Sequence, residues 1–179
     1  MAFINGKDHF KVKLWTGTGS ENAITGIGFR PDLVWTKRRD STSDHHLHDI
    51  VRGATYKFQS NDSGASSADA QTLKSFDSDG FTLGTSSQCN ASSGTFLGWS
   101  WKAGNAQGSS NTDGSINTTY TSANTAAGFS ISQYTGTGSN ATVGHGLGKP
   151  PKMIIIKSIS HSEQWVLGQS NMDDNPADS

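Results

Sequence analysis

The chain repeats one unit of sequence, and this repeat constrains its fold more than any other feature. Residues 10–20 read FKVKLWTGTGS, and residues 129–139, which lie 119 positions later, read FSISQYTGTGS. Residues 26–37 read GIGFRPDLVWTK, and residues 146–157, which lie 120 positions later, read GLGKPPKMIIIK. Each copy combines an alternating segment, a Gly-rich turn and a short apolar segment entered by proline. Reuse of a β unit favours a structural or binding protein over a single catalytic site.

The composition excludes a helix bundle and favours many short strands. Of the 179 residues, 32% are apolar and 16% are charged, and 21 are glycine. Gly, Ser, Thr, Asn and Asp favour turns over helix interiors. The 5 Trp and 8 Phe argue against a disordered chain. We therefore expect an all-β fold, an antiparallel β-sandwich of the concanavalin-like or jelly-roll type with an internally repeated strand–turn–strand unit.

Charge and cysteine content limit the partners that the chain can take. A formal net charge of −1 offers no basic field for nucleic acid. The single cysteine, Cys89, excludes an intrachain disulfide framework, and we expect its thiol to be inert. No apolar stretch approaches the roughly 20 residues of a membrane-spanning helix, and the N-terminus lacks the pattern of a signal peptide. We expect a protein made in a cytoplasm that binds no nucleic acid and does not insert into membranes.

The strand and turn pattern divides the chain into two unequal parts. Residues 1–104 are predicted to form a first β-sandwich domain, and residues 105–127 a junction rich in Gly, Ser, Asn and Thr. Residues 128–179 are a second, partial copy. This copy is expected to continue in a longer parent chain, or to be completed by packing on the first domain or a neighbouring subunit. Its apolar run at 152–157 is typical of a strand covered on both faces.

Alternation within the strands predicts which aromatic rings face the core. Leu97, Trp99 and Trp101 share one face, which we expect to be a buried core wall. Trp15 and its equivalent Tyr134 lie on the more polar face of their strands. Such a ring can stack on a sugar, anchor a partner subunit or seal the edge of the core. The only stretch with a predicted turn of helix is 65–73.

Several longer motifs together resemble a known family. They are TGIGFRPDLVW at 25–35, DIVRGAT at 49–55, SFDSDGFTLG at 75–84, WSWKAG at 99–104 and VGHGLG at 143–148. In combination with the repeated turn, they resemble a β-rich domain of unknown function found in virion and tail-fibre-like proteins of marine bacteriophages, cyanophages included. The resemblance covers roughly residues 8–167, by the extent of the repeat. It implies a concanavalin- or laminin-G-like β-sandwich on a phage particle and supplies no catalytic residues.

A short motif near the C-terminus has the form of a hydrolase nucleophile block. Residues 168–172 read GQSNM and resemble the block around the nucleophile of sialate O-acetylesterase-like SGNH hydrolases, which would make Ser170 the nucleophile. In that family an Asp and a His lie far downstream. Here only seven residues follow Met172, and none is His. We therefore treat the match as coincidental and expect no catalytic residue.

Two polar clusters invite a metal-site interpretation. Asp44, His46 and His48 alternate in the sequence DHHLHD, so on a strand they would share a face and could hold Zn or Ni. A polar loop leading into a strand is the favoured alternative, because no distant further ligand is evident. Asp77 and Asp79 in DSDG begin like a calcium loop, but the closing Glu is missing. A β-turn braced by Asp side chains is favoured, and no cofactor is predicted.

Three functional hypotheses follow from these observations. The first is a non-enzymatic structural protein of a phage virion, in the tail fibre or as a decoration of the tail or capsid surface. It would be a homo-oligomer, a trimer if in a fibre, in contact with other virion proteins. The second is a carbohydrate-binding module, which overlaps with the first if a fibre binds a host surface glycan. The third is an esterase fragment that uses Ser170. The binding or interface candidates are Trp15, Tyr134, Asp77 and Asp79.

Overall fold

The structure is almost entirely β and contains two antiparallel sheets packed as a sandwich. The computed structural model describes residues 5–170. The larger sheet has six strands, in the order β1 Phe10–Thr16, β9 Thr95–Trp101, β3 Leu33–Arg38, β4 His46–Asp49, β5 Tyr56–Gln59 and β6 Ser67–Ala68. The smaller sheet has three, in the order β2 Asn22–Thr25, β8 Gly80–Leu83 and β7 Leu73–Asp77. The predicted all-β antiparallel sandwich is confirmed.

Two hairpins and two short helical turns complete the described residues. β10 Tyr120–Asn124 pairs with β11 Phe129–Gln133, and β12 Met153–Ile156 pairs with β13 Val166–Gln169. A 3-10 turn, η1 Gly6–Asp8, precedes β1, and a helical turn, α1 Ser87–Asn90, precedes β9. In the part of the chain that the structure describes, no helix has the length and apolar character needed to cross a membrane.

Two local expectations differ from the structure. The helical turn expected within 65–73 is wrong, because Ser67 and Ala68 instead pair with Lys57 and Tyr56 of β5. The segment 105–127, predicted as a junction, contains strand β10. In both places an available strand edge, which sequence alone does not reveal, decides the conformation of small polar residues.

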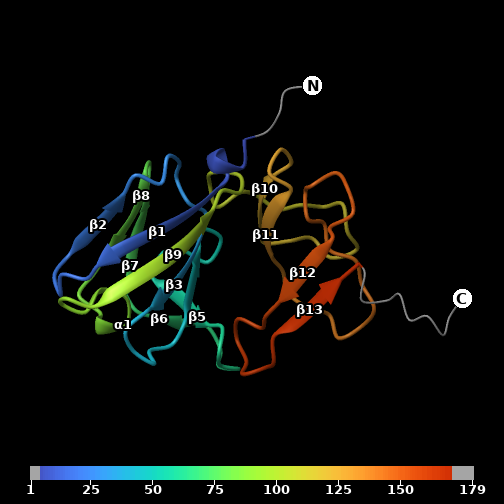
Figure 1. Cartoon of the computed structure of the whole chain (residues 1–179). Helices are drawn as coiled ribbons and strands as arrows, with labels where there is room; N and C mark the ends of the chain where they lie inside the picture. The colour runs from blue at the N-terminus through green and yellow to red at the C-terminus, as the bar shows by residue number, and fades with distance from the viewer. Residues whose placement is uncertain (1–4, 171–179) are drawn as a thin grey trace, which may run out of the picture.

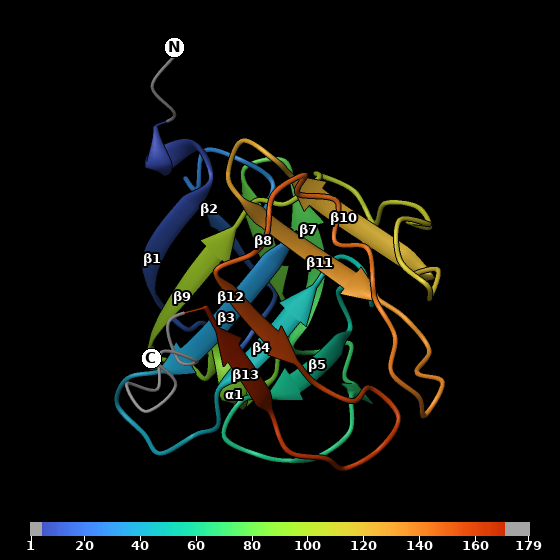
Figure 2. The same ribbon diagram turned by 90° about the vertical axis from the view of Figure 1, so that its right-hand side faces the viewer.

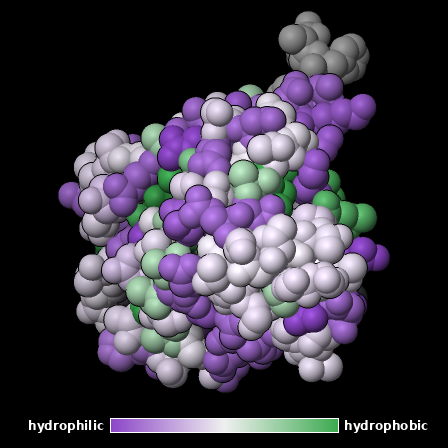
Figure 3. Space-filling view, turned by 90° about the vertical axis from the view of Figure 1, so that its left-hand side faces the viewer, coloured by the Kyte–Doolittle hydropathy of each residue, from purple (hydrophilic) through white to green (hydrophobic). Residues whose placement is uncertain are grey.

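The elements form three layers. Figure 1 shows the smaller sheet, then the larger sheet, then the two hairpins on the side of the larger sheet that faces away from the smaller one. In Figure 2 the hairpins lie in front of the larger sheet. The opposite side of the molecule, which includes the smaller sheet, shows mainly hydrophilic and neutral side chains (Figure 3). The larger sheet is therefore the central layer.

The core lies between the two sheets. Its buried side chains include Phe81 and Leu83 from β8, Ile24 from β2 and Val34 from β3. Each is 4% exposed or less, so each contributes roughly 1.5–3 kcal/mol relative to an exposed position. The short strands can thus form a stable sandwich although the chain as a whole is poor in apolar residues.

The face of β1 that carries Trp15 is the inner face. The Trp15 ring stacks on Phe96 at 5.7 Å between centroids and meets the edge of Phe81 at 5.8 Å. Gly98 makes room for it, since a Cβ there would lie 3.1 Å from the indole ring. The indole N–H donates to the backbone oxygen of Cys89 at 3.2 Å. Of the alternatives left open for Trp15, sealing the core is the one that the packing supports.

The predicted core wall on β9 is on the other face. The buried residues of β9 are Phe96, Gly98 and Ser100, whereas Leu97, Trp99 and Trp101 are only half-buried. The latter three lie on the outer face of the larger sheet, toward the hairpins. There Trp101 stacks on Phe129 of β11 at 6.3 Å, which covers part of its surface. The expectation is wrong because both faces of β9 carry large apolar residues, so spacing alone does not identify the inner one.

The hairpin β12–β13 has the same register as β3–β4. Leu33 pairs with Asp49, and 120 positions later Met153 pairs with Gln169. The turn glycines also correspond, since Gly19 and Gly138 have φ angles of +72° and +74°. Strand β2 has no counterpart, because the equivalent residues make only one isolated bridge, at Val143. The two copies therefore form matching turns and matching hairpins, but they differ in which strands surround these elements.

The apolar run of the second copy is not covered as predicted. Met153, Ile154, Ile155 and Ile156 are 43–59% exposed. The expectation of a strand covered on both faces is wrong for the described residues, because β12 pairs only with β13 and no sheet packs closely on either face. Among the described residues, this exposed hairpin presents an apolar surface.

We expect the two faces of β9 to differ in their contribution to stability. Phe96→Ala should lower the free energy of unfolding by ~3–5 kcal/mol, because Phe96 is fully buried against Trp15. Trp99→Ala should lower it by less than about half of that, since Trp99 is half-buried. Urea unfolding of both variants measures the difference. A larger loss for Trp99→Ala would contradict the assignment of the inner face.

Candidate functional site

The motifs that carry the family resemblance contact one another and brace the sandwich. Asp79, in the turn between β7 and β8, accepts hydrogen bonds from the backbone N–H groups of Gly26 (3.0 Å) and Gly28 (2.6 Å). These two donors hold the pKa of the Asp79 carboxyl below its usual value. Asp77 accepts from the hydroxyls of Ser75 (2.8 Å) and Thr82 (2.7 Å). Both carboxylates therefore bind donors of the chain itself.

Two buried charged residues that sequence reasoning missed also brace the sandwich. Asp32 accepts hydrogen bonds from the backbone N–H groups of Ala103 (2.7 Å) and Asn105 (2.8 Å). Burial raises its pKa, and these two hydrogen bonds partly offset that effect. Its position ties the start of β3 to the chain that leaves β9. A signal was present, because Asp32 and Ala103 belong to two of the motifs quoted above.

Arg52 is the second of these residues. Its guanidinium binds the Asp49 carboxylate at 2.6 Å, the Ser66 hydroxyl at 2.8 Å and the Leu47 carbonyl at 3.1 Å. It also lies over the ring of Phe58, 3.9 Å from the centroid. With a side chain that is 5% exposed, Arg52 joins β4, β5 and β6 rather than offering a charge to a ligand.

The structure does not bring Asp44, His46 and His48 together as a metal site. His46 and His48 point into the sandwich and are 0% and 1% exposed. The Asp44 carboxylate instead accepts hydrogen bonds from the side chains of Gln59 and Asn61. Within residues 5–170, no three His, Cys, Asp or Glu side chains are grouped so that they could hold a metal ion. The His pair is therefore a structural feature of the interior.

Burial keeps both histidines neutral. It lowers the pKa of His46 to about 4, with a further contribution from the charge of Lys57, and it lowers the pKa of His48 to about 3. His48 Nδ1 lies 2.9 Å from the carbonyl oxygen of Ala54, which acts as its acceptor. Within the described residues, neither ring nitrogen of His46 has a hydrogen-bond partner. Protonation of these rings is therefore unfavourable in the folded state.

Cys89 lies in the helical turn α1 and is also interior. Burial raises the pKa of its thiol to about 12. Lys57 lies nearby and donates to the side chains of Gln88 (2.9 Å) and Asp69 (3.4 Å). At neutral pH the thiolate, which is the reactive form, is scarcely populated. The geometry thus agrees with the expectation of an inert thiol.

The remaining sequence candidates lie at the surface of the second copy. Tyr134 follows β11 and is 36% exposed, so it stays available for contact. Ser170 follows β13, and its backbone N–H donates to the carbonyl of Lys152 at 3.0 Å. The rest of the GQSNM motif, from Asn171 onward, lies outside the described residues.

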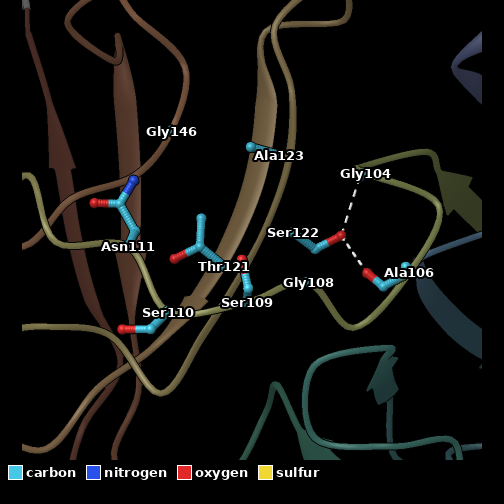
Figure 4. Close-up of a pocket in the computed structure, with 10 residues that line it drawn as sticks. All are labelled: Gly104, Ala106, Gly108, Ser109, Ser110, Asn111, Thr121, Ser122, Ala123 and Gly146. Carbon is cyan, nitrogen blue, oxygen red and sulfur yellow. Dashed lines mark hydrogen bonds between the residues drawn. The ribbon is translucent and has the colours of Figure 1, made fainter.

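One shallow depression is built entirely from small residues, half of which have polar side chains. It has a volume of about 340 Å³ and lies beside β10. Figure 4 shows Ser109, Ser110, Asn111 and Thr121 around it, and Ser122, whose hydroxyl bonds Gly104 N (3.0 Å) and Ala106 O (2.6 Å). It has no aromatic ring on which a sugar could stack and no charged side chain in its lining.

A second depression, of about 240 Å³, lies where the first sandwich meets the hairpin β10–β11. Tyr56 and Tyr120 line it together with the amide side chains of Gln107 and Gln133. Tyr56 is 46% exposed. Aromatic faces beside amide groups are the combination that binds sugar rings and their hydroxyls. Sequence reasoning missed this group because its members come from four separate segments.

The exposed hairpin is the third surface. The four strands of the two hairpins read YTSAN, FSISQ, MIII and VLGQ and carry no charged residue. Val166 and Leu167 are 56% and 51% exposed, in addition to the exposed residues of β12. Exposed apolar residues that are contiguous in this way mark surfaces for association.

The two interior histidines should make folding sensitive to acid. Their folded-state pKa values lie below the unfolded value of 6.5, so their stabilising effect is complete above about pH 6.5 and is lost as the pH falls toward 4. Between pH 7 and pH 5 the unfolding free energy should fall by about 2 kcal/mol per histidine. Urea unfolding at both pH values measures this loss.

The variant His46→Leu isolates one half of the effect. It replaces an unpaired interior ring with an apolar side chain of similar size, so stability at pH 7 should be unchanged or higher. The loss between pH 7 and pH 5 should shrink by about 2 kcal/mol relative to wild type. An unchanged pH dependence would show that His46 titrates normally in the folded protein.

Comparison with known proteins places the chain in one family. The sequence profile described as Domain of unknown function (DUF7483) matches residues 5–178. No curated protein matches the chain at a significant level. No solved structure matches it at that level either. What the protein does must therefore be argued from its own residues.

Proposed function

We propose that this chain, which belongs to the family described as Domain of unknown function (DUF7483), is a non-enzymatic structural protein that assembles through its exposed apolar strands. The observation that carries the proposal is the uncharged hairpin β12–β13, whose apolar side chains are about half exposed. An isolated two-stranded hairpin with both faces open is only marginally stable in water. A partner that covers it would stabilise it.

The resemblance in the sequence suggests the setting of this assembly. It indicates a bacteriophage virion, with the chain in a tail fibre or as a decoration of the tail or capsid surface. In that setting the protein contacts itself, as a trimer if in a fibre, and other virion proteins. The localisation is tested by immunogold electron microscopy of virions that carry this reading frame; labelling of the tail or capsid supports it, and unlabelled particles contradict it.

The contacts of the charged groups also support a structural role. The motifs on which the resemblance rests supply Asp32, Arg52 and Asp79, and each of these charged groups binds backbone or side-chain partners of the same chain. The thiol of Cys89 and the rings of His46 and His48 are buried and uncharged near neutral pH. The purified protein is accordingly expected to hydrolyse neither acetylated nor glycosidic substrates, and Ser170→Ala should change nothing measurable.

Self-association should depend on the apolar hairpin. Leu167→Lys places a charge on the exposed face of β13 and should shift the protein toward monomer, because a buried lysine without a partner is strongly unfavourable in an interface. Light scattering during size-exclusion chromatography measures the molar mass over a range of concentrations. The control Thr16→Lys adds the same charge at an exposed polar site and should leave the mass unchanged.

A monomeric wild-type protein at high concentration, with no partner in purified particles, would contradict the assembly role. An oligomer that Leu167→Lys leaves intact would place the interface elsewhere, for example on the exposed residues Phe10, Val12 and Leu14 of β1.

A second candidate function is carbohydrate binding, and the tyrosine-lined depression favours it. Tyr56 and Tyr120 line this depression together with the amides of Gln107 and Gln133. On a glycan array, wild-type protein should then bind a defined set of glycans. Tyr56→Ala should weaken that binding by about tenfold, as expected for loss of one stacking ring. The control Tyr134→Ala lies outside this depression and should bind like wild type.

A further inference from the structure

Among the described residues, strand β12 has no partner on the edge that corresponds to the edge of β3 paired with β9. In the first copy, β9 pairs with β1 on one edge and with β3 on the other, antiparallel to both. By the repeat offsets, β11 corresponds to β1 and β12 corresponds to β3. β11 pairs with β10 and β12 pairs with β13, and among the described residues no strand lies between β11 and β12. Figure 2 shows the four strands in the order β10, β11, β12, β13.

The hydrogen-bond pattern shows which groups are available on this edge. The carbonyl of Lys152 accepts from Ser170 N, just as Asp32 O accepts from Ile50 N in the first copy. Backbone groups alternate between the two edges of a strand. The N–H and C=O groups of Met153 and Ile155 therefore point away from β13. In the first copy the corresponding edge of β3 is the one that bonds β9.

The side chains around this edge indicate what kind of strand fits there. β11, β12 and β13 contain no charged residue, and Ile155 is 54% exposed. β9 itself shows a strand suited to the equivalent position: after Phe96, its large residues Leu97, Trp99 and Trp101 alternate with the small residues Gly98 and Ser100. An uncharged strand of this pattern covers apolar neighbours on one side and permits close packing on the other.

We propose that the free edge of β12 binds an extended strand of another polypeptide chain, uncharged, in which large apolar residues alternate with small ones as in β9. The bound strand runs antiparallel to β12 and takes its backbone hydrogen bonds from Met153 and Ile155. This is β-strand addition, in which backbone bonds provide affinity and alternate side chains provide specificity. The inference rests on the proposed assembly role and names the site through which assembly occurs.

The experiment uses a synthetic peptide with the β9 sequence TFLGWSW, flanked by lysines for solubility, and the intact protein. Fluorescence anisotropy of the labelled peptide measures binding. A scrambled peptide of the same composition should bind at least about tenfold more weakly, because the alternation is lost. Hydrogen exchange should slow at Met153 and Ile155 when the β9 peptide is bound.

A matched pair of variants tests the backbone contribution. Ile155→Pro removes an N–H that points away from β13, so the β12–β13 hairpin keeps its own bonds, and it should weaken peptide binding by about tenfold. Ile155→Val keeps the N–H and should bind within about twofold of wild type. A β9 peptide N-methylated at Gly98 tests the same bonds on wild-type protein, which keeps the test valid if Ile155→Pro folds poorly.

Equal binding of the scrambled and N-methylated peptides would show mere apolar adsorption and would overturn the proposal. A dimer of intact protein that pairs β12 with β12, and that the β9 peptide does not disturb, would also overturn it by identifying a second copy as the occupant. Assembly that Leu167→Lys abolishes, without selective peptide binding, would refute strand addition and leave the assembly role intact. Selective peptide binding by a protein that is absent from virions would support strand addition and contradict the assembly role in a virion.

Discussion

The antiparallel pairing of β9 with both β1 and β3 is the contact on which the larger sheet depends. It joins residues more than 60 positions apart in sequence, since Val12 pairs with Trp99 and Trp99 pairs with Trp35. These pairings place Phe96 opposite Trp15 and Gly98 beside the Trp15 ring, so that the indole fits into the interior. Without this strand, β1 would have no partner in the described structure and β3 would keep only β4.

Carboxylates that accept backbone hydrogen bonds then hold this arrangement together. Asp32, which is buried, ties the residues after β9 to the entry of β3, and Asp79, which is exposed, holds the turn that follows β2. A buried carboxylate such as Asp32 is stable only where several donors reach it, and here those donors are backbone N–H groups. The motifs quoted in the sequence analysis thus supply internal supports of the sandwich. This explains why residues that look chemically reactive in the sequence bind partners within the chain in the structure.

The second copy shows what the repeated unit does without a central strand. The hairpin β12–β13 keeps the register of β3–β4, and its connecting loop docks on the first domain. Trp165 donates to Asp62 O at 2.9 Å, and its ring meets Phe58 at 5.5 Å. The strands themselves remain exposed, because no described strand fills the place that β9 takes in the first copy. Local sequence is therefore sufficient to form the hairpin and insufficient to bury it.

The sequence by itself determined the secondary structure type and the repeated Gly-rich turns. Period-two patterns and Gly-rich turns act locally. The turns at DSDG and TGTG could therefore be predicted without knowledge of the tertiary structure. Only the tertiary structure decided which face of each strand is buried. Both faces of β1 and β9 carry large apolar or aromatic residues, and the inner face follows from the fit of Trp15 against Gly98 and Phe96. The burial of His46 and His48 and the exposure of Ile155 were likewise decided by distant strands, because burial depends on which sheet packs against which face.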